Sequence, residues 1–387
     1  MKFLLKTIEK VKPNFEKGGK FHYLHSTFDA LETFLFVPGH TSHTKVHVRD
    51  GIDLKRTMFT VIIAMIPVLL FGMWNVGYQH HLSIGEQASL LQNLLHGAIK
   101  VMPIVVVSYG VGLGIEFFFA QKNGHSVNEG FLVTGMLIPL CLPPTIPLWM
   151  VAVGTAFAVI VGKEVFGGTG MNLLNPALTA RVFLFFAYPA YMSGEYLSSG
   201  KALWYSGDRA LNVDGYSGAT SLSLVAEGKP FEYSAMDMFM GLEKGSIGET
   251  SVLACLIGAV ILIATGIGSW RIITSVFAGG LLMGTIFNLV GGTPFLDMPA
   301  YYHLLMGGFA FGAVFMATDP VSASQTELGK IIYGLLIGIL TVLIRVSNPA
   351  YPEGMMLAIL LMNVFAPLID YYVVDGNKKR RLKRATI

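Results

Sequence analysis

Long apolar stretches, separated by short polar or glycine-rich segments, recur along the chain from residue 57 onward. A helix needs roughly 20 mainly apolar residues to cross a bilayer. The pattern predicts ten crossings, at residues 57–77, 102–120, 129–142, 148–162, 177–191, 251–268, 272–290, 301–318, 331–346 and 354–374. We therefore expect an all-α polytopic integral membrane protein.

The third, fourth and fifth stretches are short, about 14 or 15 residues each, and prolines interrupt or bound them. Non-helical backbone at bilayer depth persists only where it is buried in protein or lines a cavity. Transporter folds use such broken helices in pairs to build binding sites. Asn175-Pro176-Ala177 and Asp319-Pro320-Val321 are a candidate pair, but the predicted topology places both on one face, which does not suit a simple inverted repeat.

The distribution of basic residues predicts the orientation. Ten Lys and Arg precede Thr57, and six more lie between residues 378 and 384. An even number of crossings puts both termini on one side, and the positive-inside rule makes that side cytoplasmic. The expected segments are a cytoplasmic N-terminal segment (1–56), a first bundle (57–191), an extracytoplasmic loop (192–250), a second bundle (251–374) and a basic cytoplasmic tail (375–387).

Composition narrows the function classes. The chain is 53% hydrophobic and 13% charged, against about 25% charged in soluble domains. This argues against a soluble enzyme or a nucleic-acid binder. Two cysteines cannot supply the four ligands of an iron–sulfur cluster, and the ten histidines show no metal-ligand spacing. Without a Gly-x-Gly-x-x-Gly turn between a strand and a helix, NADH binding by this chain is not expected.

The polar loop contains one segment that is a candidate for a chemical role, Asp214-Gly-Tyr-Ser217-Gly218-Ala219-Thr220. Read conservatively, it is an Asp-Gly turn followed by small residues. Small side chains also let a planar group approach the backbone, and the Thr220 hydroxyl can be esterified while Asp214 holds a metal-bound nucleotide. The spacing resembles the acceptor motif of bacterial flavin transferase, and the loop lies on the side where that enzyme works.

Several further segments extend this resemblance over the whole chain. They are residues 15–20, 47–50, 53–56, 127–130, 163–170, 175–176, 308–312, 316–322 and 348–354. Together they resemble the B-subunit family of bacterial sodium-translocating NADH:quinone reductases. The related D subunits of Rnf electron-transport complexes carry a similar flavin motif. The long N-terminal segment, with its 47–50 and 53–56 motifs, favours the sodium-pump branch.

The resemblance implies a specific redox role. It implies FMN linked through its phosphate to Thr220, a riboflavin, and partner subunits that receive electrons from NADH. Electrons would pass from an FMN on a partner to this FMN, then to the riboflavin and to quinone, coupled to sodium export. A flavin transferase would attach the FMN. The alternatives are an Rnf-type subunit in a ferredoxin:NAD complex and a cofactor-free channel or secondary transporter.

A glycine- and asparagine-rich segment is the candidate riboflavin site. Gly168 and Gly170 permit close backbone approach, and Asn172 and Asn175 can hydrogen-bond a ring edge. The conservative alternative is a glycine-rich connection between broken helices. Both readings stay open from the residues alone.

Other polar residues are candidates for quinone and sodium. The N-terminal segment, with His22, and Gly112 in the second stretch are candidates for the quinone site. Acids at membrane depth are costly and usually functional, which makes Glu116, Asp319 and Asp370 candidates for the sodium path. The alternatives are that Asp319 caps a helix, that Asp370 pairs with the basic tail, and that Glu164 pairs with the adjacent Lys163.

Overall fold

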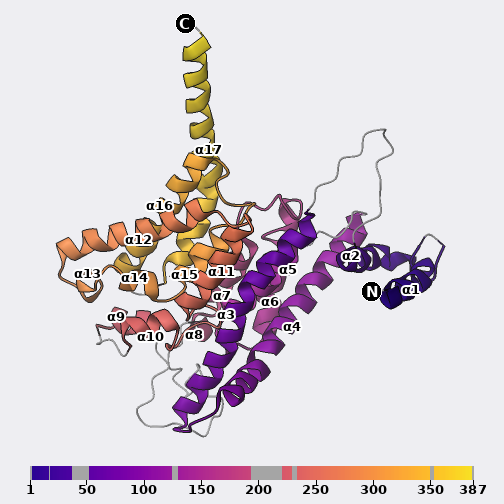
Figure 1. Cartoon of the computed structure of the whole chain (residues 1–387), viewed down its shortest axis with the longest axis horizontal. Helices are drawn as coiled ribbons and strands as arrows, with labels where there is room; N and C mark the ends of the chain where they lie inside the picture. Colours follow the sequence, from indigo (N-terminus) through magenta and orange to yellow (C-terminus); the bar gives the residue numbers. More distant parts are fainter. Residues whose placement is uncertain are drawn as a thin grey trace.

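The structure is a computed structural model, and it describes residues 2–16, 18–36, 52–123, 130–192, 220–228, 233–348 and 353–385. Every regular element within these ranges is helical (Figure 1), so the predicted all-α class is confirmed. Six helices are long and apolar enough to cross a membrane: α3 (Leu54–Ser83), α4 (Leu90–Asn123), α6 (Leu148–Ile160, extended by a turn to Phe166), α12 (Trp270–Val290), α16 (Glu327–Ser347) and α17 (Met355–Ala385).

Shorter helices complete the bundle. Three are apolar: α5 (Gly130–Leu140), α7 (Pro176–Ala187) and α11 (Val252–Ala264). Short helices α8 (Pro189–Met192), α9 (Ser221–Ala226), α10 (Ala235–Met240) and α13 (Pro294–Asp297) lie in the connections. Two N-terminal helices, α1 (Lys2–Val11) and α2 (His25–Leu35), extend away from the bundle (Figure 1).

The predicted eighth stretch is not one helix, which corrects the expectation for residues 301–318. It is divided into α14 (Tyr302–Leu305), α15 (Phe309–Phe311) and a π-helix, η4 (Gly312–Met316). Gly307 breaks the run with φ +62°, a conformation that costs glycine little. The carbonyls of His303 and Met306, freed by this break, accept hydrogen bonds from the Arg345 guanidinium at 2.5 and 2.9 Å. The break is therefore stabilised from a neighbouring helix.

Glycines let the long helices pack backbone to backbone. A Cβ on Gly97 would lie 1.6 Å from the Met73 carbonyl oxygen, so α4 contacts α3 directly. A Cβ on Gly338 would lie 2.1 Å from the Val276 carbonyl oxygen, so α16 contacts α12 in the same way. Small residues at helix contacts are typical of membrane bundles, where close van der Waals packing replaces the hydrophobic drive.

The bundle has two halves, α3–α7 and α11–α17. They meet where Gly258 of α11 packs against α3, its Cβ position 2.5 Å from the Ala64 carbonyl oxygen. One hydrophobic core runs through both halves. In each half a phenylalanine ring fills the space over a glycine: Phe131 over Gly112 of α4, and Phe309 over Gly280 of α12.

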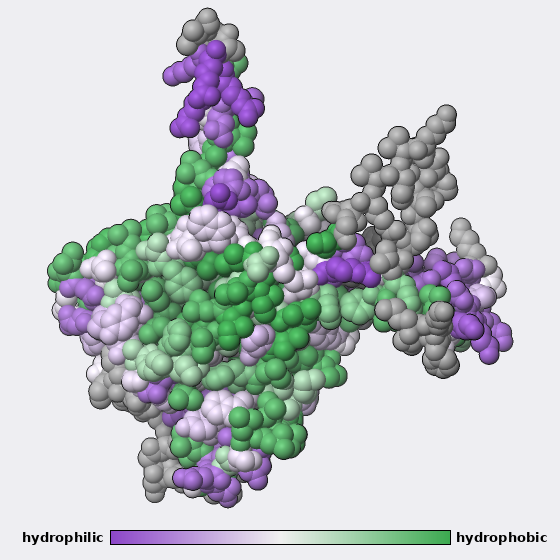
Figure 2. All heavy atoms as spheres, in the orientation of Figure 1, coloured by the Kyte–Doolittle hydropathy of each residue, from purple (hydrophilic) through white to green (hydrophobic). Residues whose placement is uncertain are grey.

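The surface separates apolar from charged regions. Figure 2 shows hydrophobic side chains over the body of the bundle and hydrophilic ones on the projecting end of α17 and on the N-terminal helices. Exposed apolar side chains of α3, α4 and α12, such as Leu70, Val106 and Leu289, account for part of this surface. Such a surface is expected where helices face lipid.

Candidate functional site

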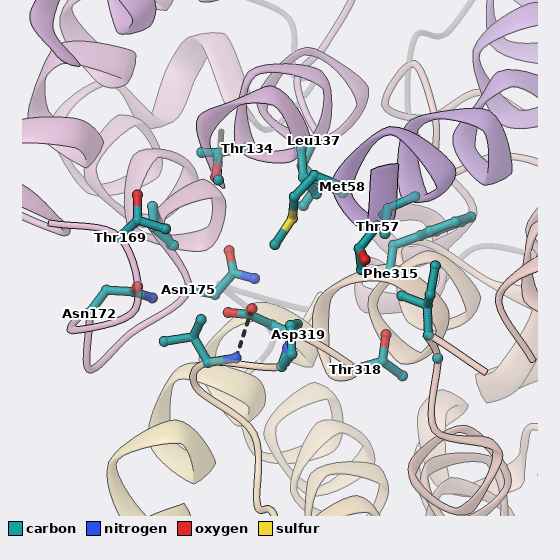
Figure 3. Close-up of a pocket in the computed structure, with 18 of the residues that line it drawn as sticks. Thr57, Met58, Thr134, Leu137, Thr169, Asn172, Asn175, Phe315, Thr318 and Asp319 are labelled. Atoms are coloured by element: carbon teal, nitrogen blue, oxygen red, sulfur yellow. Dashed lines mark hydrogen bonds between the residues drawn. The ribbon is translucent and has the colours of Figure 1, made fainter. Parts of the chain in front are cut away.

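A cleft lies between the two halves, where the ends of several helices converge (Figure 3). The cavity itself measures about 90 Å³, and it opens into a wider space of about 810 Å³ that includes solvent. The start of α3, the start of α5, the segment before α7, the end of α11 and the segment after η4 contribute to its wall. Its lining residues are Thr57, Met58, Val61, Gly130, Val133, Thr134, Leu137, Lys163, Thr169, Asn172, Asn175, Pro176, Leu262, Ile267, Gly268, Phe315, Thr318, Asp319, Pro320 and Val321.

The glycine-rich segment before α7 forms a tight turn beside the cleft. Gly167, Gly168 and Gly170 have φ values of +113°, +93° and +89°, which L side chains rarely adopt. The Gly168 amide donates to the Lys163 carbonyl oxygen at 3.1 Å. Gly168 and Gly170, predicted as riboflavin contacts, therefore shape the turn, and neither belongs to the lining of the cleft.

The two predicted asparagines do line the cleft. Asn175 caps α7, because its Oδ1 accepts from the amides of Ala177 at 3.0 Å and Leu178 at 3.3 Å. Asn172 holds its position by donating from Nδ2 to the Leu174 carbonyl oxygen at 3.0 Å. Figure 3 shows Asn175 and Met58 reaching into the middle of the cleft from opposite sides.

The cleft contains a buried polar group that lacks a partner. The hydroxyl oxygen of Thr169 is buried and forms no hydrogen bond within the described part of the chain. An unsatisfied buried hydroxyl costs about 1–3 kcal/mol, and a ligand with a polar edge would remove that cost. Apolar walls with a few convergent polar groups are typical of small-molecule sites. The residues present thus fit a flat, mainly apolar ring with hydrogen-bonding edges, such as a flavin.

A buried ion pair closes one side of the cleft. Lys163, a lining residue, pairs with Glu116 of α4, and both side chains are about 5% exposed or less. The alternative that Lys163 pairs with its neighbour Glu164 is wrong. Glu116, which is predicted to lie on the sodium path, is thus paired with Lys163.

The other two predicted acids have separate partners. Asp319 lines the cleft and forms an Asx turn: it accepts from the Val321 amide at 3.2 Å and the Ser322 hydroxyl at 2.7 Å. Residues 320–323 are not a regular helix, so the helix-cap alternative is wrong. Among the described residues, no group of three or more His, Cys, Asp or Glu side chains is arranged to hold a metal ion.

Asp370 of α17 fastens a loop rather than the basic tail. Its carboxylate accepts from the Ser324 hydroxyl at 2.6 Å, the Gln325 amide at 2.7 Å, and both the amide and hydroxyl of Thr326 at 3.0 and 2.6 Å. The expectation of pairing with the tail is therefore wrong. The three acids do not form one site, and their role in sodium transport stays a prediction.

The two candidates for quinone lie elsewhere. Gly112 is buried, and the Phe131 ring occupies the space over it, with its nearest carbon 1.8 Å from where a Cβ on Gly112 would stand. His22 is exposed in a 3-10 turn, η2 (His22–Leu24), of the N-terminal segment. Neither lines the cleft, and both stay predictions.

Thr220 lies in a second region, far along α3 from the cleft. It caps α9, accepting from the Ser223 amide at 3.3 Å. The adjacent Ser221 donates to the Glu243 carboxylate at 2.5 Å. Asn75 of α3 donates to the Glu243 carbonyl oxygen at 3.0 Å. Asp214, Ser217, Gly218 and Ala219 lie outside the described residues.

The separation of the two regions follows from helix geometry. The cleft begins at Thr57 of α3, and the Thr220 region contacts α3 at Asn75. Eighteen residues of α-helix at 1.5 Å per residue correspond to about 27 Å. The cleft and the Thr220 region therefore lie close to opposite ends of the membrane-spanning bundle.

A buried charge network lies near the Thr220 region. Arg181 of α7 pairs with Glu249, and with Glu353 at 2.6 Å. Arg345 of α16 donates to the Glu353 carbonyl oxygen at 2.9 Å, in addition to the carbonyls at the break before α15. Sequence reasoning missed this network, although two arginines inside apolar stretches were a signal for it. Burial raises the pKa of Glu243, in the connecting loop, to about 8.

Comparisons with known proteins identify the family. Residues 41–379 match the NQR2, RnfD, RnfE family. The chain is 50% identical to the B subunit of the Na+-translocating NADH-quinone reductase of Stutzerimonas stutzeri, covering 97% of this chain and 98% of that protein. The corresponding subunits of Ectopseudomonas mendocina and Pseudomonas aeruginosa are 49% and 48% identical over the same shares. The resemblance inferred from the sequence is thus confirmed, and the chain belongs to the NQR2, RnfD, RnfE family.

Proposed function

We propose that this chain is the flavin-bearing membrane subunit of a sodium-pumping NADH:quinone reductase. It carries FMN on the Thr220 hydroxyl and riboflavin in the cleft, and it passes electrons toward quinone while the complex exports sodium. The observation that carries the proposal is the cleft itself. Two predicted asparagines line it, together with apolar walls and a threonine whose hydroxyl has no partner among the described residues.

The arrangement of the helix ends supports the proposed orientation, with both termini cytoplasmic in a bacterial inner membrane. If ten crossings alternate from a cytoplasmic N-terminus, the segments at residues 57, 130, 163–176, 262–268 and 318–321 all lie on the cytoplasmic side. These are the segments that converge on the cleft. The same alternation puts Thr220 outside, where a flavin transferase would reach it.

The Rnf-type alternative differs from the proposed function in the partner subunits that it requires. The family description covers both branches, while the relatives at 48–50% identity carry the name of the sodium-translocating reductase. The proposed partners are accordingly the other subunits of that complex and a quinone. Purification of the native complex would identify them. Recovery of a ferredoxin-linked complex without quinone reductase activity would favour the Rnf-type reading.

The covalent FMN is tested on a denaturing gel. Wild-type chain, produced with its flavin transferase, is expected to fluoresce, and Thr220→Ala to lose the signal completely. Ser223→Ala is the matched control, because it removes the serine hydroxyl to which the Thr220 hydroxyl donates but leaves the Thr220 hydroxyl in place. A dark wild-type band would contradict the FMN assignment.

The riboflavin site is tested by flavin extraction from the purified complex. Thr169→Val keeps the side-chain volume but removes the hydroxyl of this lining residue, and we expect the affinity for riboflavin to fall at least tenfold. Thr155→Val is the control. The Thr155 hydroxyl is also buried without a partner among the described residues, but it does not line the cleft. Equal riboflavin content in both variants would place the flavin elsewhere.

A further inference from the structure

The cleft has one positively charged side chain among its described lining residues, Lys163, and one acid, Asp319. The two differ in how their charge is used. Asp319 accepts hydrogen bonds from its own turn. The Lys163 ammonium pairs with the carboxylate of Glu116, a residue of α4 that is not among the described lining residues. Of this ion pair, only the lysine is among the described lining residues of the cleft.

The structure holds Lys163 in place through its backbone as well as its side chain. Its carbonyl oxygen accepts from the amides of Phe166 and Gly168, both at 3.1 Å. The same residue thus organises the glycine turn and supplies the cation. Its side chain is 5% exposed and that of Glu116 is 4% exposed, so the screening of these charges by water and salt is weak.

Reduction of a bound ring places negative charge in this poorly screened space. A fixed cation nearby stabilises the reduced form more than the oxidised form, which raises the reduction potential. A lysine ammonium has three N–H donors. Pairing with Glu116 uses one of them, and the others can be directed at a ring edge.

We propose that Lys163 sets the reduction potential of the flavin in the cleft, with Glu116 as the positioning residue that holds the ammonium at the wall. This rests on the proposed riboflavin site. One electron from the preceding carrier of the complex adds one negative charge to the ring. Lys163 keeps its proton, and no covalent bond of this chain forms or breaks.

A purely structural ion pair would behave differently. It would lower stability when broken but would leave the potential of the bound flavin unchanged. The proposal instead predicts opposite shifts on removing the two partners. Loss of the lysine charge lowers the potential, while loss of the glutamate charge raises it, because the remaining ammonium is no longer compensated.

The experiment is a redox titration of the riboflavin absorbance in the purified complex. We expect Lys163→Met to decrease the ratio of reduced to oxidised riboflavin at a fixed potential at least tenfold, which is 59 mV for a one-electron couple. Glu116→Gln should increase the ratio, and Lys163→Arg should stay near wild type. Lys330→Met is the control, since Lys330 pairs with Glu327 in a partly exposed site outside the cleft lining.

Lys163→Met removes the lysine charge from the buried Glu116 carboxylate, so the double variant Lys163→Met/Glu116→Gln provides a neutral pair that folds more readily. Its riboflavin should also titrate at a lower potential than wild type. Riboflavin content is measured first in every sample. Wild type without riboflavin would contradict the proposed function. Riboflavin present at an unchanged potential in the double variant, or riboflavin lost only from the lysine variants, would overturn the role of Lys163 in setting the potential.

Discussion

The bundle contains two buried charged regions. They differ in whether a cavity lies beside the charged side chains. Near the Thr220 region, Glu249 and Glu353 pair with Arg181. Arg345 is held by the backbone carbonyls of His303, Met306 and Glu353. At the cleft, Lys163 pairs with Glu116, and the lysine also lines a cavity. The first arrangement fastens helices together, whereas the second leaves room for a ligand. Burial of charge alone therefore does not mark a binding site.

The largest expected effect on stability comes from breaking the buried charge network of Arg181, Glu249 and Glu353. Arg181→Leu leaves Glu249 and Glu353 buried without their cation, which should cost about 3–5 kcal/mol. Heating of membranes, followed by immunoblotting of the soluble detergent extract, would report the loss. Lys12→Met is the control, because its pair with Glu32 is partly exposed and exposed pairs contribute about 0–1 kcal/mol. Similar losses in both variants would remove the distinction between the two kinds of pair.

A smaller effect is expected at Asp370. Asp370→Asn replaces an acceptor oxygen by an amide donor facing the donors of residues 324–326, and should cost about 1.5–3 kcal/mol. Asp375→Asn on the same helix is the control, since its partner Lys379 is exposed. The same heating assay measures both. An Asp370 variant as stable as the control would show that the loop does not depend on this carboxylate.

A pH-dependent effect is expected at Glu243. Its pKa is raised by burial to about 8, so the folded protein retains a proton that the unfolded chain releases above its ordinary pKa near 4.5. Stability from this group is present at low pH and is lost as pH rises toward 8. Wild type should therefore lose heat resistance relative to Glu243→Gln between pH 6 and 8.5.

The control for this pH dependence is Glu227→Gln, which changes an exposed carboxyl in the same loop region. That variant should follow wild type across the pH range. Parallel profiles for Glu243→Gln and wild type would contradict the protonated state of Glu243.

The smallest expected stability change is at the cleft. Thr169→Val removes a hydroxyl that has no partner among the described residues, so the free energy of unfolding without flavin should change by less than about 0.5 kcal/mol. The same variant should lose riboflavin. A stability loss comparable to that of Arg181→Leu would make Thr169 a structural residue rather than a binding one.

The sequence predicted the helices better than it predicted the contacts between them. Hydrophobic runs marked the long helices because each spans the bilayer alone, without reference to its neighbours. The break at Gly307 was missed because its stabilising partner, Arg345, lies on another helix. Equally, nothing in the spacing of Glu116 and Lys163 shows that α4 passes the end of α6.

The candidate site was predicted in part. Asn172 and Asn175 were found from their chemistry and do line the cleft, because their short segment carries its own geometry. Their neighbours across the cleft, Thr57 and Asp319, come from distant parts of the chain. Asp319 was singled out for its charge, but its place in the same cleft as Asn175 depends on packing between the halves, which a single sequence does not show.

The distance of about 27 Å along α3 between the two regions has an electrical consequence. It is close to the thickness of the bilayer hydrocarbon, about 30 Å. With the proposed flavins at these places, each electron that moves from the Thr220 end to the cleft carries one negative charge across most of the membrane field. Against a potential of 100 mV, negative inside, a full crossing requires work of about 2.3 kcal/mol. With the flavins at the proposed places, the electron step from the Thr220 end to the cleft would thus run against the membrane voltage.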